Sequence, residues 1–211
     1  VEWEEAVKRD YNHPSIIGWC PLNETYGLFG SASAKCSVAI YDKTKEVDPT
    51  RIVIGSSGGF HYKTDICDMH SYTHNAEEIV AAALRRNNGI AFGIIGKIKK
   101  LFSKGKLLSP KELEEYPLFL SEFGGLTYMQ EGKSWGYHKA ISSEEEFIEK
   151  YKELVDNVIQ CKDICAFCFT QLTDVEQEQN GLVKYNRKSK FSDKSIERIA
   201  EINKQKAKIE D

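Results

Sequence analysis

Short apolar runs alternate with longer amphipathic stretches along most of this sequence, and this alternation constrains the fold more than any other feature. Short runs that are apolar throughout are typical of buried parallel strands, and the amphipathic stretches between them are typical of covering helices. The pattern therefore predicts an α/β fold built from βα units. The five predicted strands are 16–20, 51–55, 66–70, 118–122 and 166–170.

Capping signals define the predicted helices. Asn75 precedes two glutamates and is a predicted N-cap, and this helix should end at 87–89. Ser143 and Glu146 predict a capping box ahead of a helix whose apolar residues recur at three-and-four spacing. The charged stretch from Ser192 onward predicts a closing surface helix.

The segment 89–110 departs from this pattern, because it is rich in glycine and carries the basic run 97–100. A helix that binds a membrane surface or a partner is one interpretation. An insertion packed over the helices, with its lysines in solvent, is the preferred one, because the basic run is short and interrupted by glycine.

The net charge of −3 and the pI near 6.0 favour neither nucleic acid nor an anionic membrane as a partner. No apolar run approaches the roughly 20 residues that a membrane-spanning helix needs. We therefore expect no nucleic-acid and no membrane partner.

The six cysteines are predicted to be free thiols. Cys20, Cys67, Cys165 and Cys168 lie in or beside apolar runs, where a reduced thiol behaves as a small hydrophobic group. The spacing of Cys161, Cys165 and Cys168 does not fit the paired loops of a zinc site, and we expect no metal and no cofactor. Buried thiols favour a reducing, cytoplasmic compartment. Export of a longer parent protein stays open, because the sequence opens without Met inside a predicted helix.

Polar residues gather where the predicted strands end. Asn23 and Glu24 follow the first strand, His70 and Tyr72 end the third, and Glu122 ends the fourth. Because the carboxyl ends of parallel strands line one shared mouth, these residues are candidates for catalysis or binding.

Two further polar loops are expected to be structural. The segment 56–59 has serines and glycines but lacks the lysine of a phosphate-binding loop, so it is predicted to be a plain βα turn. Asp174, Glu176 and Glu178 could bind a cation, but a solvated cluster paired with Arg187 is the preferred interpretation.

Glu24 and Glu122 together suggest a reaction. Cleavage of a glycosidic bond uses one carboxylic acid to protonate the departing oxygen and a second carboxylate to attack or to activate water. The two glutamates are three βα units apart and could face each other across a barrel mouth. Two unrelated surface glutamates are the alternative.

Several motifs, in order, resemble glycoside hydrolase family 2, which includes β-galactosidases, β-glucuronidases and β-mannosidases. Residues 9–19 with Asn23-Glu24 resemble its acid/base signature, and 118–124 resemble its nucleophile motif. Segments 48–51, 68–72 and 170–187 fit the remaining strands and loops. The similarity runs from about residue 1 to about residue 191.

This resemblance implies a partial (β/α)8 TIM barrel, with strands four to eight and their helices. Residues 1–211 would be the C-terminal half of a catalytic domain whose first three strands and β-sandwich domains are absent. An open half-barrel exposes strand edges, so we expect a homo-oligomer or association with the missing half.

The resemblance also assigns roles. Glu24 would be the acid/base and Glu122 the nucleophile of a retaining reaction. Asn23 would bind the sugar 2-hydroxyl, while His70 and Tyr72 would lie close to the nucleophile. Trp135 would stack against a sugar face.

A β-galactoside is the preferred carbohydrate substrate. A β-mannosidase or β-glucuronidase specificity, or a related barrel family acting on β-mannans or β-glucans, are alternatives. Cys20-Pro21-Leu22 stands where the family has Ser-Leu-Gly, which leaves the sugar open. The chain could also be a catalytically inert folding unit with an incomplete sugar site.

Overall fold

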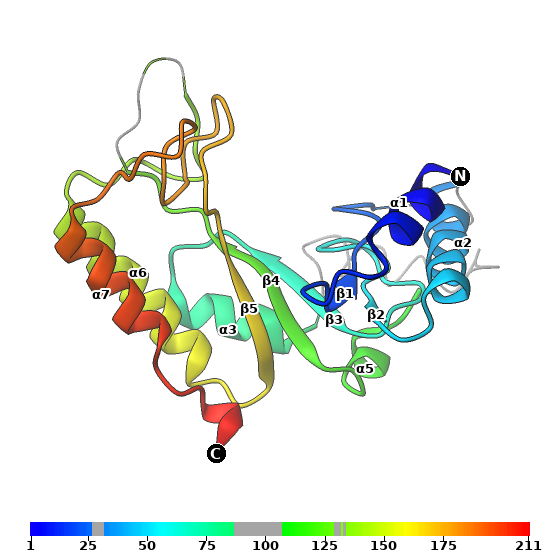
Figure 1. Ribbon diagram of the computed structural model, residues 1–211. Helices are drawn as coiled ribbons and strands as arrows, with labels where there is room; N and C mark the ends of the chain where they lie inside the picture. The colour runs from blue at the N-terminus through cyan, green and yellow to red at the C-terminus, as the bar shows by residue number, and fades with distance from the viewer. Residues whose placement is uncertain (27–31, 87–106, 129–131, 133) are drawn as a thin grey trace. The chain divides into compact units, whose positions relative to one another are not determined.

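The computed structural model describes residues 1–26, 32–86, 107–128, 132 and 134–211. Strands and helices alternate along the described chain (Figure 1), so the predicted α/β class is confirmed. The chain forms two compact units. Unit 1 comprises 1–70 and 85–119, and unit 2 comprises 71–84 and 120–211. The predicted insertion up to residue 106 lies outside the described residues. The helix after Asn75 ends at Leu84, earlier than the predicted 87–89.

In its described residues, unit 1 holds two long helices, a short one and a two-stranded parallel sheet. Its elements are α1 (Glu2–Asp10), β1 (Gly18–Trp19), α2 (Ala32–Val47), β2 (Ile52–Val53) and α5 (Pro110–Leu113). Strands β1 and β2 pair in parallel, with Gly18 opposite Ile52. A Cβ atom on Gly18 would lie 2.7 Å from the Ile52 side chain, so glycine allows the strands to approach. Helix α1 packs against α2.

The core of unit 1 forms where α1 and the small sheet meet. Val7, Trp19 and Val53 are buried there, and partly buried aromatic and aliphatic side chains surround them. Strand β1 is shorter than the predicted segment 16–20, because Ile17 is 83% exposed and only Gly18 and Trp19 pair in register with β2.

Asp48, the buried residue that follows α2, fastens the helix to the sheet. Its carboxylate accepts hydrogen bonds from Trp19 Nε1 at 2.8 Å, from Thr50 Oγ1 at 2.6 Å and from the Arg51 guanidinium at 2.6 Å. Burial acts to raise the pKa of Asp48, but hydrogen bonds from Thr50, Trp19 and Arg51 outweigh it and hold the pKa below its usual range.

Unit 2 contains three α-helices and strand β5 in its described residues. Its elements are α3 (Ala76–Leu84), α6 (Glu144–Ile159), β5 (Ile164–Thr170), α7 (Asp193–Asn203) and a 3-10 turn (Lys208–Glu210). Strands β3 (Cys67–Ser71) and β4 (Leu118–Gly124) carry residues of both units, and the sheet order is β3-β4-β5. Helix α6 packs against α3 and α7 (Figure 1). All five predicted strands therefore form, with shifted bounds.

The predicted N-cap residues of α3 and α6 make the expected side-chain hydrogen bonds. The Asn75 side chain accepts a hydrogen bond from the Glu78 amide, and the Ser143 side chain accepts one from the Glu146 amide. The predicted capping box at Ser143 is wrong in its second half, because the Glu146 carboxylate bonds Ser142 instead. The predicted apolar face of α6 is confirmed by its buried residues, which are Phe147, Ile148, Tyr151, Leu154, Val155, Val158 and Ile159.

The prediction of buried thiols holds for Cys67 and is wrong for Cys20, Cys165 and Cys168, which are exposed. Cys165 and Cys168 lie on β5, where most side chains are exposed or half-buried, so apolar neighbours along a strand do not ensure burial of a thiol. All six cysteines are free, as predicted.

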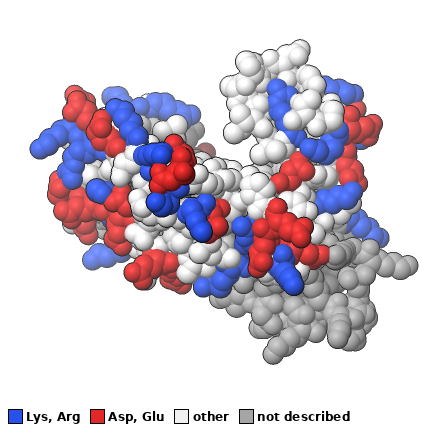
Figure 2. All heavy atoms as spheres, turned by 90° about the horizontal axis from the view of Figure 1, so that it is seen from below, with Lys and Arg blue, Asp and Glu red and all other residues white. Residues whose placement is uncertain are grey.

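The surface of α6 and α7 carries acidic and basic side chains intermixed, as Figure 2 shows on the face in view. Ion pairs such as Lys150–Glu153 and Arg198–Glu145 account for part of this mixture. No helix within the described ranges is long and apolar enough to span a membrane.

Candidate active site

The candidate residues fall into two groups, one in each unit. Asn23, Glu24 and His70 belong to unit 1, and Glu122 belongs to unit 2 together with Tyr72 and Trp135. Each group has its own hydrogen-bonding partners.

In unit 1 the loop after β1 is held by backbone hydrogen bonds that continue the β1–β2 pairing. The Ser57 amide donates to Leu22 O at 2.8 Å, and the Glu24 amide donates to Ser57 O at 2.7 Å. Asn23 forms a parallel bridge with Ser57. Glu24 has a φ of 44°, in the left-handed region, and its side chain is 46% exposed. The loop therefore presents the Glu24 carboxyl at the surface on a fixed backbone.

A chain of side-chain hydrogen bonds leads from Glu24 into the interior of unit 1. His70 Nδ1 lies 2.9 Å from Glu24 Oε1, and His70 Nε2 lies 2.9 Å from Ser57 Oγ. The Ser57 hydroxyl donates to Asp68 Oδ2 at 2.8 Å. Asp68 is fully buried. The structure thus brings Glu24 and His70 together and links both to a buried carboxyl group.

The walls around this chain fix its geometry. Gly58 has a φ of +61°, and its amide donates to Asp68 Oδ2 at 2.8 Å. A Cβ atom on Gly58 would lie 2.2 Å from the His70 ring, so only glycine fits there. On the other side, Nε2 of the buried His61 lies 3.1 Å from Asp68 Oδ1.

Ser57 and Asp68 were missed as site residues by the sequence analysis. The segment 56–59 was predicted to be a plain turn. The available signal was the spacing of Asp68 and His70, because residues two apart on a strand point to the same face. Ser57 carried no comparable signal, since its position depends on the path of the loop.

In unit 2 the second glutamate has a tyrosine as its partner. The Tyr72 hydroxyl donates to Glu122 Oε2. Burial and this hydrogen bond raise the pKa of Tyr72 above its usual range, so the phenol stays protonated. The Tyr72 ring stacks on Tyr137 with centroids 3.6 Å apart and planes 5° from parallel. The predicted proximity of Tyr72 to Glu122 is therefore present, and Tyr137 is an additional member of the site.

Two glycines directly after Glu122 make room for these rings. Gly124 has a φ of +95°, and a Cβ atom there would lie 2.3 Å from the Phe169 ring. Gly125 has a φ of +60°, and a Cβ atom there would lie 2.5 Å from Tyr137. Because L side chains rarely adopt such φ values, both positions require glycine.

Trp135 reaches this group through Tyr137. Its ring meets Tyr137 edge to face with centroids 5.7 Å apart, and the residue is 50% exposed. The Trp135 amide donates to Gln177 O at 2.8 Å, and its carbonyl accepts from the Gln179 amide at 3.2 Å. Trp135 is therefore held by backbone hydrogen bonds to the loop after β5, with half of its surface exposed.

The acidic loop after β5 differs from the prediction. Asp174 pairs with Lys190 at 2.7 Å, and both side chains are buried, so the predicted pairing with Arg187 is wrong. Arg187 donates to Thr173 Oγ1 instead. Lys190 lies within reach because the chain turns back beneath the loop, a path that sequence spacing does not reveal. Burial, and next the charge of Glu122, raise the pKa of Glu178.

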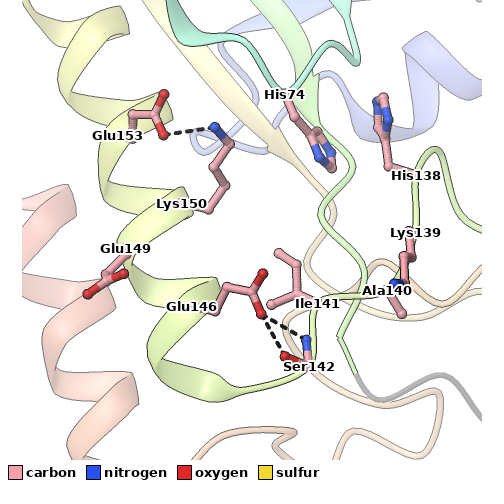
Figure 3. A pocket seen from close by; sticks show the side chains of 10 residues that line it. All are labelled: His74, His138, Lys139, Ala140, Ile141, Ser142, Glu146, Glu149, Lys150 and Glu153. Atoms are coloured by element: carbon pink, nitrogen blue, oxygen red, sulfur yellow. Dashed lines mark hydrogen bonds and ion pairs between the residues drawn. The ribbon is translucent and has the colours of Figure 1, made fainter.

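A cavity of about 570 Å³ lies between the 138–142 loop and α6 in unit 2 (Figure 3). His74 and His138 form its wall opposite α6, with ring centroids 3.8 Å apart. His74 Nε2 bonds Gly124 O at 3.2 Å, and His138 Nε2 bonds Tyr72 O at 2.7 Å. This cavity is lined by none of the predicted site residues, but His138 holds the backbone at Tyr72 and His74 holds it at Gly124.

The two glutamates thus have chemically different hydrogen-bonding partners. Glu24 faces an imidazole, which can exchange a proton with it, and Glu122 faces a phenol, which donates to a carboxylate. Carboxyl groups near the carboxyl ends of strands in an α/β fold are typical of glycoside hydrolases with a TIM barrel.

The family model for glycosyl hydrolases family 2, TIM barrel domain, matches residues 2–200. The chain belongs to this glycoside hydrolase family, and its fold is a part of the TIM barrel, as the sequence motifs predicted.

Solved structures with this fold include uronide-cleaving enzymes. A family 2 β-galacturonidase from Eisenbergiella tayi bound to galacturonate is 19% identical, with a TM-score of 0.60 over 97% of this chain and 36% of its own. A β-D-glucuronidase from Dictyoglomus thermophilum is 17% identical, with a TM-score of 0.60 over 97% of this chain and 35% of its own. A Ruminococcus gnavus β-glucuronidase in complex with uronic isofagomine is 19% identical, with a TM-score of 0.59 over 97% and 34%.

These similarities show the fold and do not extend to the substrate. The chain spans about a third of the length of the solved structures that it matches. No curated protein matches it.

Proposed function

We propose that the protein containing this chain hydrolyses β-glycosidic bonds with retention, using Glu24 as acid/base and Glu122 as nucleophile. The observation that carries the proposal is the contrast between the two partners: an imidazole at Glu24 and a phenol at Glu122. A double displacement needs this division, because one carboxyl group must carry a proton while the other is ionised.

In the first step the Glu24 carboxyl gives its proton to the glycosidic oxygen while a Glu122 oxygen attacks the anomeric carbon. The bond to the leaving group breaks, and a glycosyl ester forms on Glu122. In the second step the Glu24 carboxylate takes a proton from water, and the water oxygen attacks the same carbon and releases Glu122. A retaining enzyme holds the two carboxyl groups roughly 5–5.5 Å apart.

The remaining candidates would bind the sugar. Asn23, next to Glu24 in the loop after β1, would bond the 2-hydroxyl, a contact that strengthens as the ring gains positive charge. Tyr72 would fix one oxygen of the nucleophile. Trp135 and Tyr137 offer an aromatic corner against which a sugar face can stack.

A neutral β-galactoside is the proposed substrate, and β-glucuronides and β-mannosides are the alternatives. The solved structures named above act on or bind uronic acids, according to their descriptions. Glu178 lies near enough to Glu122 for charge to raise the Glu178 pKa. A uronate carboxylate would add a third negative charge beside these two, so a neutral sugar fits better.

We also propose that residues 1–211 are one portion of a larger catalytic domain. The alternative, an inert folding unit, predicts that the 211-residue chain forms no glycosyl ester under any condition.

The test is covalent trapping in the longest natural polypeptide that contains residues 1–211. The protein is incubated with the 2,4-dinitrophenyl 2-fluoro-β-glycosides of galactose, glucuronic acid and mannose, and its peptides are analysed by mass spectrometry. The expected result is one sugar adduct on Glu122, formed fastest with the galactoside. Glu122→Gln should give none.

Glu24→Gln is the matched control. A dinitrophenyl leaving group departs without protonation, so this variant should still form the adduct and then release it slowly. An adduct on a different residue, or none with all three sugars, contradicts the proposal. Repeating the experiment on the 211-residue chain decides between an active portion and an inert unit.

A further inference from the structure

The hydrogen bonds of unit 1 that lead from Glu24 to the interior have a fixed donor-to-acceptor direction. The buried residue Asp68 determines this direction. Asp68 Oδ2 accepts from the Gly58 amide, which can only donate, and it also accepts from the Ser57 hydroxyl. A serine hydroxyl has a single proton. Because the Ser57 hydroxyl donates that proton to Asp68, its oxygen can act only as a hydrogen-bond acceptor toward His70.

This direction decides the tautomer of His70. Nε2 must carry a hydrogen in order to donate to Ser57 Oγ at 2.9 Å. In a neutral imidazole the other nitrogen, Nδ1, then has a bare lone pair. Nδ1 lies 2.9 Å from Glu24 Oε1, and the imidazole side chain is 6% exposed while the Glu24 side chain is 46% exposed.

A lone pair on Glu24 Oε1 and a lone pair on His70 Nδ1 would repel each other at 2.9 Å, so a proton must lie between the two atoms. Either Glu24 is protonated and donates to neutral His70, or His70 is an imidazolium and donates to ionised Glu24. The Glu24–His70 pair therefore holds one proton between its two side chains in both favourable arrangements.

We propose that Ser57 is a positioning residue that, through His70, keeps this proton available to Glu24 for donation to the glycosidic oxygen. The inference rests on the proposed function for its reaction, and on the geometry of unit 1 for the proton. When Glu24 has given its proton away, the lone pairs face each other again, which favours recovery of a proton from water in the second step.

Other ionisable groups surround the pair. Within unit 1 they are Asp68, His61 beside it, and Cys20 near Ser57. Partial desolvation and the charge of Asp68 raise the pKa of Cys20, so the thiol stays neutral and leaves the Ser57 proton on Asp68.

Ser57→Ala tests the role of the hydroxyl. Without it, neutral His70 is free to adopt the Nδ1–H tautomer and donate to ionised Glu24. A hydrogen bond to a charged group is worth about 1.5–3 kcal/mol, so the alkaline limb of the kcat profile should move down by about one pH unit or more. The shift should appear with an alkyl β-glycoside, which needs protonation, and be absent with a dinitrophenyl β-glycoside.

Two variants separate this effect from simple loss of structure. Ser57→Thr restores a hydroxyl and should restore the profile. Ser56→Ala removes the neighbouring buried hydroxyl, which accepts a hydrogen bond from the Thr25 amide at 3.1 Å. This hydroxyl is not one of the groups that link Glu24 to Asp68. The variant should leave the position of the alkaline limb unchanged. Equal losses at every pH for Ser57→Ala and Ser56→Ala, with both leaving groups, would overturn the proposal.

A measurement that needs no activity distinguishes failure of this inference from failure of the proposed function. The ¹⁵N chemical shifts of the His70 ring report which nitrogen is protonated. We expect hydrogen on Nε2 in the wild type, and a neutral Nδ1–H tautomer in Ser57→Ala. A bare Nε2 in the wild type overturns the inference whatever the enzyme hydrolyses. A protonated Nε2 in a protein that cleaves no β-glycoside upholds the proton arrangement and rejects the reaction.

Discussion

Single buried carboxyl groups organise both the fold and the candidate site of unit 1. Asp48 gathers donors from Trp19, Thr50 and Arg51, and Asp68 gathers donors from Ser57 and Gly58. A buried charge is tolerated only when it is paired and hydrogen-bonded, so each of these side chains dictates the conformation of the loop around it.

Replacing Asp48 with asparagine should destabilise the chain. The amide side chain would keep the shape of the carboxylate but leave Arg51, whose side chain is 16% exposed, without its anion. Removing one partner of a buried ion pair costs about 3–5 kcal/mol in the free energy of unfolding. Urea denaturation at neutral pH measures the loss. Asp42→Asn, which removes an exposed partner of Lys63, should cost less than about 1 kcal/mol.

The pH dependence of the same variant has a definite sign. The folded-state pKa of Asp48 is lowered, so its contribution is complete above the unfolded-state value, about 3.9, and is lost as the pH falls below that. The Asp48→Asn variant should therefore lose less stability than the wild type on acidification. A parallel loss in both proteins would show that Asp48 is not the ionised anchor.

For single residues, the sequence predicts which positions belong to the candidate site better than it predicts the side chains that contact them. Glu24 and Glu122 could be found because strand ends and motifs mark them. Ser57 and Tyr137 could not, because their contacts arise from loops that return to the site: Ser57 through backbone bonds to Leu22 and Glu24, and Tyr137 through its stacking on Tyr72.

Among the elements, the 138–142 loop joins the candidate site to α6. His138 holds the Tyr72 backbone, His74 holds Gly124, and the two rings lie against each other. Burial, and next the charge on His138, lower the pKa of His74 to about 4. This loop therefore holds best when the histidine pair is neutral.

The free energy of unfolding should consequently fall on acidification, because protonation of His74 is disfavoured in the folded state. The unfolded state binds a proton at His74 below about pH 6.5, whereas the folded state resists until about pH 4. Between these values the unfolded state holds more protons, so acidification destabilises the fold, by about 1–2 kcal/mol after allowance for solvent screening.

His74→Gln removes the charge and keeps a donor for Gly124 O. Its free energy of unfolding should depend less on pH across this window than that of the wild type, as judged by urea denaturation at several pH values. His13→Gln, at a side chain that is 63% exposed, is the control and should follow the wild type. A His74→Gln variant with the full acid sensitivity would exclude the histidine pair as its source.

The elements themselves were predictable to the extent that local signals decide them. The cap residues Asn75 and Ser143 accept the hydrogen bonds expected of them, because a cap depends on neighbours within one turn. The exposure of Cys165 and Cys168 was not predictable, since it depends on what covers the faces of β5. Apolar composition identifies a strand without saying what covers it.

At the scale of the whole molecule, the decisive fact is that the chain spans about a third of the solved structures that it matches. The remaining two thirds of those structures have no counterpart in this chain. Among the described side chains of unit 1, Ile17, an apolar residue beside the short strand β1, is 83% exposed.

We predict that the 211-residue chain self-associates through this edge. An unpaired strand edge with an exposed apolar side chain is a template for pairing, and burying one isoleucine contributes about 1.5–3 kcal/mol. Ile17→Lys should therefore weaken association by about tenfold or more, measured by sedimentation velocity across a range of protein concentrations. Ile209→Lys is the control, because Ile209 is 45% exposed in the terminal 3-10 turn and lies on no strand edge. A wild-type chain that sediments as a monomer at low micromolar concentration would refute the association, and equal weakening by both variants would place it on another surface.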